Sequence, residues 1–169
     1  MVSIDLEDAC ADCADLCCVS FEFDAEQGFA LQKAADSPCP HLKPTGGCAI
    51  HATRQQQGMS PCLSYSCHGA GQYVTQVLFQ GRHWRDDPKL APQMTAALRE
   101  LAQIHSCLSL LKQAQSLPLS PEKQAELARV SEQLTPSEGW SLEALALWPA
   151  QAVKTKTHQF LRGLANDLA

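Results

Sequence analysis

The chain has 169 residues and a net charge of −5, with 45% hydrophobic and 18% charged side chains. That balance is typical of a globular protein and excludes a disordered chain, and the length suits one ordinary domain with its own core. No apolar run approaches the roughly 20 residues that a membrane-spanning helix needs. The chain start, Met1 to Glu7, carries no basic stretch followed by an apolar one, so the sequence predicts no signal peptide, no membrane partner and a cytoplasmic location.

Charge is unevenly distributed along the chain. The segment 1–32 contains acidic side chains but no lysine or arginine, whereas the segment 33–169 contains all of the basic side chains and slightly fewer acidic ones. A nucleic-acid-binding protein normally has a clustered basic surface, and the sequence shows none. We therefore expect no nucleic-acid partner, and the acidic first segment favours a cation as ligand.

The segment 4–31 predicts short elements of two kinds. Residues 4–18 contain good helix formers with acids in the first turn, and a helix there would align Cys10, Cys13 and Cys17 along one face. Residues 21–31 alternate apolar and polar side chains on both sides of a turn. That pattern predicts a short β-hairpin.

Residues 36–71 predict a long loop, because prolines and glycines interrupt every regular pattern there. A loop of this length in a compact domain needs something other than a hydrophobic core to order it, and a bound metal would do so. Residues 72–80 fit a helix or a strand equally well.

The second half of the chain predicts a helical bundle. A long amphipathic helix is expected over 92–115, a second one begins at Ser120 and Pro121, Ser141 begins a short one, and a last one starts near residue 151. The predicted fold is mainly α: a cysteine-rich metal-binding module with a short β-hairpin (1–71), packed as one compact unit on a C-terminal helical region (72–169). The helical half is a candidate surface for a protein partner, but no motif in it indicates which partner.

All the cysteines except Cys107 lie between Cys10 and Cys67. In a secreted chain they would indicate disulfides, but without a signal peptide they indicate metal binding or redox chemistry. Thiolates are soft ligands, and four of them hold one zinc ion or the corners of an iron–sulfur cluster. The sequence therefore predicts a zinc or iron centre, in one site or two, and the candidate ligands are Cys10, Cys13, Cys17, Cys18, Cys39, Cys48, Cys62 and Cys67.

Three histidines lie among these cysteines and are the possible substitutes for a thiolate: His41, His51 and His68. His105, on the apolar face of the long helix, is expected to be a core histidine. Cys107 in the same helix is expected to behave as a small buried hydrophobic residue.

No catalytic motif is present: the sequence contains no P-loop, no HExxH pair and no Ser/His/Asp signature. The sequence does not decide whether the protein is an enzyme, but the lack of a catalytic motif favours a protein without enzymatic activity. Three functions remain: a module ordered by its metal, an iron–sulfur redox protein or enzyme component, and a metal-handling or metal-sensing protein.

The C-x2-C-x3-C-C opening (Cys10 to Cys18), followed by Cys39-Pro40-His41-Leu42 and Cys48-Ala49-Ile50-His51, resembles a bacterial family of zinc- or iron-chelating cysteine-cluster proteins. The resemblance covers residues 8–68 and implies that the cysteines from Cys10 to Cys62 are metal ligands, with Cys67 as the eighth. Flagellin lysine methylases carry a similar cysteine cluster, attributed to an iron–sulfur centre. The chain departs from the family pattern at His51, where tyrosine is usual, at Arg54-Gln55, where Arg-Pro is usual, and in a longer stretch before Cys62.

Overall fold

A computed structural model describes residues 4–167, so the start of the predicted module and the end of the helical region lie outside it. The chain consists of helices joined by loops, and β pairing among the described residues is limited to two isolated antiparallel bridges. The elements are η1 (Cys10–Asp12), α1 (Leu16–Ser20), η2 (His51–Thr53), α2 (Pro61–Ser64), α3 (Ala70–Gln72), the π-helix η3 (Tyr73–Leu78), η4 (Pro88–Leu90), α4 (Ala91–Ala114), α5 (Pro121–Gln133), α6 (Leu142–Ala146) and α7 (Ala150–Asp167).

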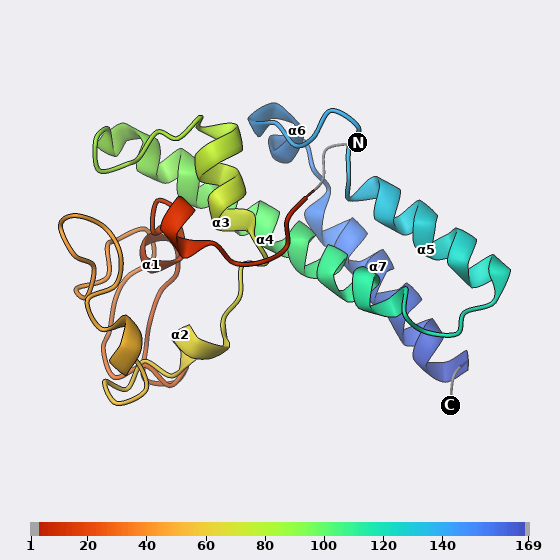
Figure 1. Cartoon of the computed structure of the whole chain (residues 1–169), viewed down its shortest axis with the longest axis horizontal. Coiled ribbons are helices and arrows are strands. Elements are labelled where there is room, and N and C mark those ends of the chain that lie inside the picture. Colours follow the sequence, from red (N-terminus) through yellow and green to blue (C-terminus); the bar gives the residue numbers. More distant parts are fainter. Residues whose placement is uncertain (1–3, 168–169) are drawn as a thin grey trace.

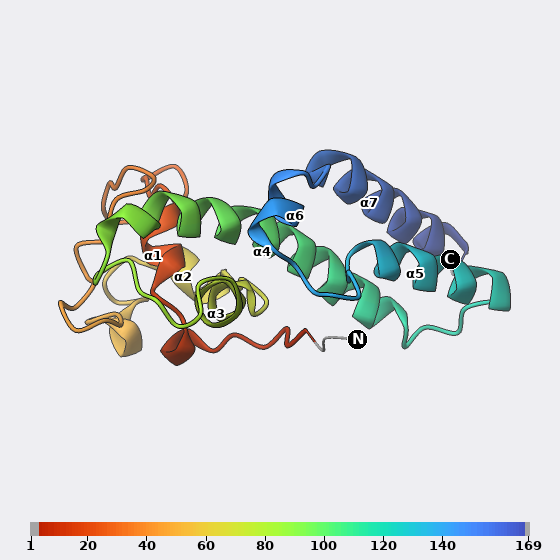
Figure 2. The same ribbon diagram turned by 90° about the horizontal axis from the view of Figure 1, so that it is seen from above.

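The molecule is elongated and has two lobes that share α4 (Figure 1). The cysteine lobe, residues 4–69, gathers α1, α2 and the long loops at one end, and the helical lobe, residues 70–167, places α5, α6 and α7 toward the other end (Figure 2). Helix α4 contacts α1 in the first lobe and α5, α6 and α7 in the second. One long helix therefore fixes the position of the cysteine lobe on the bundle.

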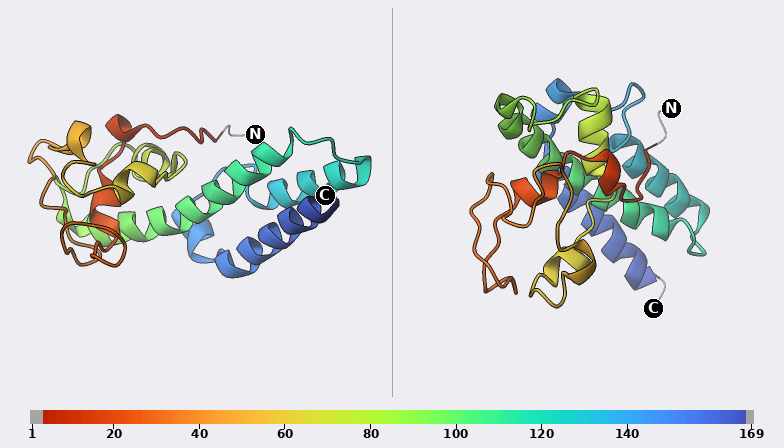
Figure 3. Two further views of the ribbon diagram at one scale, coloured as in Figure 1. Left: turned by 90° about the horizontal axis from the view of Figure 1, so that it is seen from below. Right: turned by 60° about the vertical axis from the view of Figure 1, so that its left-hand side comes forward.

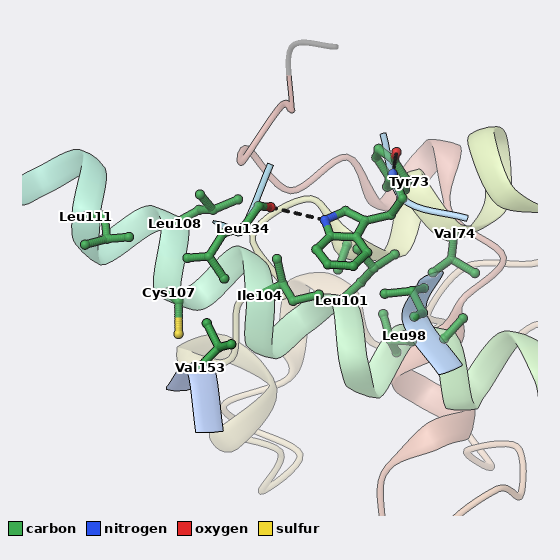
Figure 4. Close-up of a cluster of buried hydrophobic side chains, with 14 of the residues drawn as sticks. Tyr73, Val74, Leu98, Leu101, Ile104, Cys107, Leu108, Leu111, Leu134 and Val153 are labelled. Carbon is green, nitrogen blue, oxygen red and sulfur yellow. Dashed lines mark hydrogen bonds between the residues drawn. The ribbon is translucent and has the colours of Figure 1, made fainter. Parts of the chain in front are cut away.

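The core of the helical lobe lies along one face of α4, as the predicted helix over 92–115 requires. Leu98, Leu101 and Ile104 are fully buried there, and side chains from η3, α6 and α7 pack over them (Figure 4). Burying a side chain of this kind contributes about 1.5–3 kcal/mol. The predicted helical bundle is confirmed.

The predicted helix starts are confirmed by their caps. The Ser120 hydroxyl accepts the N–H of Lys123 at 3.3 Å at the start of α5, and the Ser141 hydroxyl accepts the N–H of Ala144 at 3.1 Å at the start of α6. These side chains satisfy amides that the first turn of a helix leaves unpaired. Residues 72–80, which fit helix or strand, are helical through residue 78.

The predicted β-hairpin over 21–31 is wrong. Its ladder is reduced to a single bridge between Phe23 and Lys33, because the amide of Ala30 donates across to the carbonyl of Gly58 in another loop. The rings of Phe23 and Phe29 stack on each other with their centroids 4.2 Å apart. Packing between loops has replaced strand pairing.

The expected helix over 4–18 is also wrong, since the structure breaks it into η1 and α1. Asp15 lies between them in the left-handed region, with φ of 56°. Its carboxylate accepts hydrogen bonds from the Gly47 amide and from Arg85, at 3.0 and 2.6 Å. Contacts with residues far along the chain therefore decide this break, and Cys10, Cys13 and Cys17 do not form one helical stripe.

Candidate metal centre

A cavity of about 780 Å³ occupies the cysteine lobe, and its walls come from three segments that are distant in the sequence. Figure 3 shows how the loops of this lobe gather beside α1. Two of the three candidate histidines, His41 and His51, also line the cavity. Seven of the eight candidate ligands are among its lining residues: Cys10, Cys13, Cys17, Cys18, Cys39, Cys48 and Cys62.

The first wall is the segment from η1 to α1, and hydrogen bonds to the backbone of Ala14 fix its position. The Ala14 amide donates to the hydroxyl of Thr75 at 2.9 Å, and its carbonyl accepts the indole N–H of Trp84 at 2.7 Å. Farther along the same wall, the sulfur atoms of Cys17 and Cys18 are 4.0 Å apart. That separation is close to the edge of about 3.8 Å of a tetrahedron with metal–sulfur bonds of about 2.3 Å.

The second wall is the loop from Cys39 to Cys48. The Cys39 amide donates to the carbonyl of Cys18 at 2.9 Å, which joins this loop directly to α1. The loop then turns back on itself, because Leu42 and Cys48 form an isolated antiparallel bridge. Asp15 holds the far side of this turn through the Gly47 amide.

The third wall is the region of α2 with Cys62. The guanidinium of Arg54 donates to the carbonyl of Cys62 through Nη1 and to that of His51 through Nε, each at 2.9 Å. Met59 is buried beneath this wall with Phe23 and Cys39. Arg54 therefore sets the distance between the His51 and Cys62 stretches.

Cys67 lies outside the cavity but next to Cys13. A Cβ atom on Gly71 would lie 2.6 Å from the sulfur of Cys13 and 3.6 Å from that of Cys67, so both sulfurs pack against this glycine. The Cys67 thiol donates to the Asp8 carboxylate at 3.2 Å, and the Asp8 carboxylate also accepts the Gly69 amide at 3.1 Å. Cys67, the eighth candidate ligand, therefore lies beside Cys13 but outside the cavity that the other seven line.

His68 does not line the cavity. Its carbonyl accepts the Nδ1–H of His105 at 2.7 Å, and His105 is fully buried against Tyr73. Burial lowers the pKa of His105 to about 4, so the ring is neutral at pH 7. The expectations that His105 is a core histidine and that Cys107 is buried are both confirmed.

The environment of the thiols favours their protonated form. Burial raises the pKa of Cys13 to about 12 and also raises those of Cys10, Cys39 and Cys62. For Cys17 the hydrogen bond with Cys18 comes first and burial second, and together they raise its pKa well above the usual value. At neutral pH these side chains are therefore thiols, and a metal that binds them has to displace their protons.

All nine cysteines, each within the described part of the chain, are free thiols. Among residues 4–167, no three histidine, cysteine, aspartate or glutamate side chains already converge on one point as a ready-made metal site. The structure thus brings seven candidate ligands to the walls of one cavity without drawing them around a common centre.

Comparisons with known proteins give one relative and no family. The chain is similar to the uncharacterized protein YybG of Bacillus subtilis (strain 168), with 29% identity over 160 residues. The match covers 95% of this chain and 57% of the relative, so the chain spans little more than half of that protein's length. No family model matches the sequence, and no solved structure matches it. None of the described helices is long and apolar enough to cross a membrane.

Proposed function

We propose that the protein binds zinc or iron through the thiolates of the cysteine lobe, and that the bound metal orders this lobe. One observation carries the proposal: seven of the eight cysteines between Cys10 and Cys67 line a single cavity, although they come from three separate segments. The resemblance to the zinc- or iron-chelating cysteine-cluster family points to the same chemistry.

The donor set fits a thiophilic metal. Thiolates prefer zinc, iron–sulfur clusters and other soft centres over magnesium or calcium. The pair Cys17 and Cys18 already has a sulfur–sulfur spacing near that of a tetrahedral site. When bound, the metal would crosslink the three walls by taking its ligands from the cysteines that line them.

Apart from Ala14 and Leu16, which belong to the core around α4, the lobe has little apolar packing to stabilise it. Its own buried cluster consists of Phe23, Cys39 and Met59, with partly buried neighbours. A loop region of this length without a substantial core is expected to gain order from a crosslink, and metal binding then contributes directly to folding.

Metal content tests the proposal. We expect protein purified without oxygen to contain zinc or iron by elemental analysis, and Cys17→Ser to lose most of it. Cys107→Ser is the matched control, because Cys107 is buried in α4 away from the cavity and its replacement should leave the metal content unchanged. Wild-type protein without metal, or equal losses in both variants, would refute the proposal.

The visible spectrum of the same samples separates two forms of the function. An iron–sulfur redox protein or enzyme component gives a coloured sample whose iron and sulfide both disappear in Cys17→Ser. A zinc module gives a colourless sample. A metal-handling protein differs from both in its affinity, since a competing chelator would remove its ion readily.

The raised thiol pKa values predict how binding depends on pH. Each thiol that becomes a ligand releases a proton, so the apparent zinc affinity should rise about tenfold per pH unit for every proton released. Because the pKa of Cys13 is about 12, this increase should continue through pH 6.5, 7.5 and 8.5 without a plateau. Chelator competition at these three values measures it, and an affinity independent of pH would exclude thiol ligands.

A further inference from the structure

The basic residues of the cysteine lobe gather at the cavity. The segment 1–81 is rich in acidic side chains, and its basic ones are limited to Lys33, Lys43 and Arg54. Lys43 and Arg54 line the cavity, and Lys33 lies behind the wall that contains Cys18 and Cys39. Asp15 and Glu22 also line the cavity, so its wall contains both signs of charge, and the inference below depends on the buried position of Lys33.

Lys33 differs from the other two because it is buried, with 8% of its surface exposed. Its ammonium donates to three carbonyl oxygens, those of Val19, Ala34 and Ser37, at 3.1, 2.9 and 2.8 Å. It also lies 4.8 Å from the centroid of the Phe23 ring. These contacts hold the ammonium in one place, but none of them supplies a negative charge.

The compensating charge is expected from the two neighbouring cysteines. Val19 follows Cys18, Ser37 lies two residues before Cys39 in the chain, and the Cys39 amide donates to the Cys18 carbonyl. Burial lowers the pKa of Lys33, and Cys39, then Cys18 and then Asp36 oppose that shift. The nearest carboxylate along the chain, Asp36, is already paired with Arg99 at 2.8 Å.

A buried charge is costly unless an opposite charge compensates it. A divalent ion held by four thiolates has a net charge of −2, so metal binding would create an anion beside this cation. We propose that Lys33 is the built-in counter-charge of an anionic metal–thiolate centre on the Cys18 and Cys39 side of the cavity. This inference rests on the proposed function and assigns Lys33 a positioning role that acts through the ligands.

Zinc affinity, measured by chelator competition in reducing buffer, tests the inference. Lys33→Met removes the charge but keeps an unbranched side chain, and we expect zinc to bind about tenfold more weakly or worse. Lys89→Met is the matched control, since it makes the same change at an exposed position in η4, outside the residues that line the cavity, where water and salt screen the charge. Its effect should stay within about threefold.

A second neutral variant separates charge from hydrogen bonding. Lys33→Gln keeps N–H donors for the carbonyls of Val19, Ala34 and Ser37, so a purely structural role predicts near-wild-type zinc affinity. The counter-charge role predicts that Lys33→Gln binds zinc as weakly as Lys33→Met, and that Lys33→Arg restores affinity to within about threefold of wild type. If Lys33→Met fails to fold, Lys33→Gln decides alone, with its fold checked by circular dichroism.

Different results would overturn the proposed function and the counter-charge role of Lys33. Wild-type protein that binds neither zinc nor iron overturns the proposed function, and this inference with it. Wild-type protein that binds zinc, with Lys33→Gln as tight as wild type or Lys33→Met no weaker than Lys89→Met, overturns the counter-charge role alone.

Discussion

The two lobes share one helix but are stabilised differently. In the helical lobe, apolar side chains from η3 and α5 to α7 converge on α4 and form one continuous core. In the cysteine lobe the separate buried cluster is limited to Phe23, Cys39 and Met59, and the loops are joined by individual hydrogen bonds from Asp15, Lys33 and Arg54. This contrast is the reason why we propose that the cysteine lobe depends on a bound metal for its order, whereas burial stabilises the helical lobe.

The largest effect is expected in the core of the helical lobe. Leu101→Ala removes a fully buried side chain from α4 and should lower the free energy of unfolding by about 3–5 kcal/mol. Leu147→Ala is the control, since Leu147 is 85% exposed and its truncation should change stability by less than about 0.5 kcal/mol. Urea denaturation followed by circular dichroism measures both, and equal effects would mean that α4 is not the centre of the core.

The next effect concerns the contact between α4 and the cysteine lobe. The folded protein keeps His105 neutral with a pKa of about 4, whereas the unfolded chain binds a proton near pH 6.5. Stability should therefore fall as the pH drops from 6.5 to 4, by about 3 kcal/mol from this residue. His105→Asn, which keeps a donor for the His68 carbonyl, should lose this component. Parallel pH profiles for the two proteins would contradict the assignment.

A smaller and more local effect is expected at Gly71. In Gly71→Ala the new methyl group would lie 2.6 Å from the Cys13 sulfur, which has to move. Overpacking of this kind costs about 1–3 kcal/mol, and it should weaken zinc binding by about tenfold. Gly163→Ala is the control in α7, where a Cβ meets nothing within 4 Å, and it should raise stability by about 0.5–1 kcal/mol. Unchanged zinc affinity in Gly71→Ala would remove Cys13 from the ligand set.

The sequence was most informative where one local rule determines the structure. The repeat of apolar side chains along α4 and the capping serines Ser120 and Ser141 predicted their helices, because periodicity and capping act within a few residues. The hairpin over 21–31 failed because Ala30 bonds to Gly58, which no local pattern shows.

The candidate site was predictable as a set of residue types but not as a geometry. The spacing of the cysteines predicted all eight candidate ligands. Only the fold shows that Cys67 lies outside the cavity and next to Cys13. The hydrogen bonds of Lys33 and the ion pair between Asp15 and Arg85 could not be predicted from the sequence either, since each depends on partners in separate segments. The scarcity of basic residues near the cysteines was the one available signal for Lys33.

Hydrogen exchange with and without a chelator tests the central claim most directly. Metal-loaded protein, kept free of oxygen, would be compared with the same protein after metal removal under reducing conditions. We expect residues 8–70 to lose amide protection on metal removal, whereas α4, α5 and α7 keep theirs. Equal exchange of residues 8–70 in both samples would contradict the claim that metal orders the cysteine lobe.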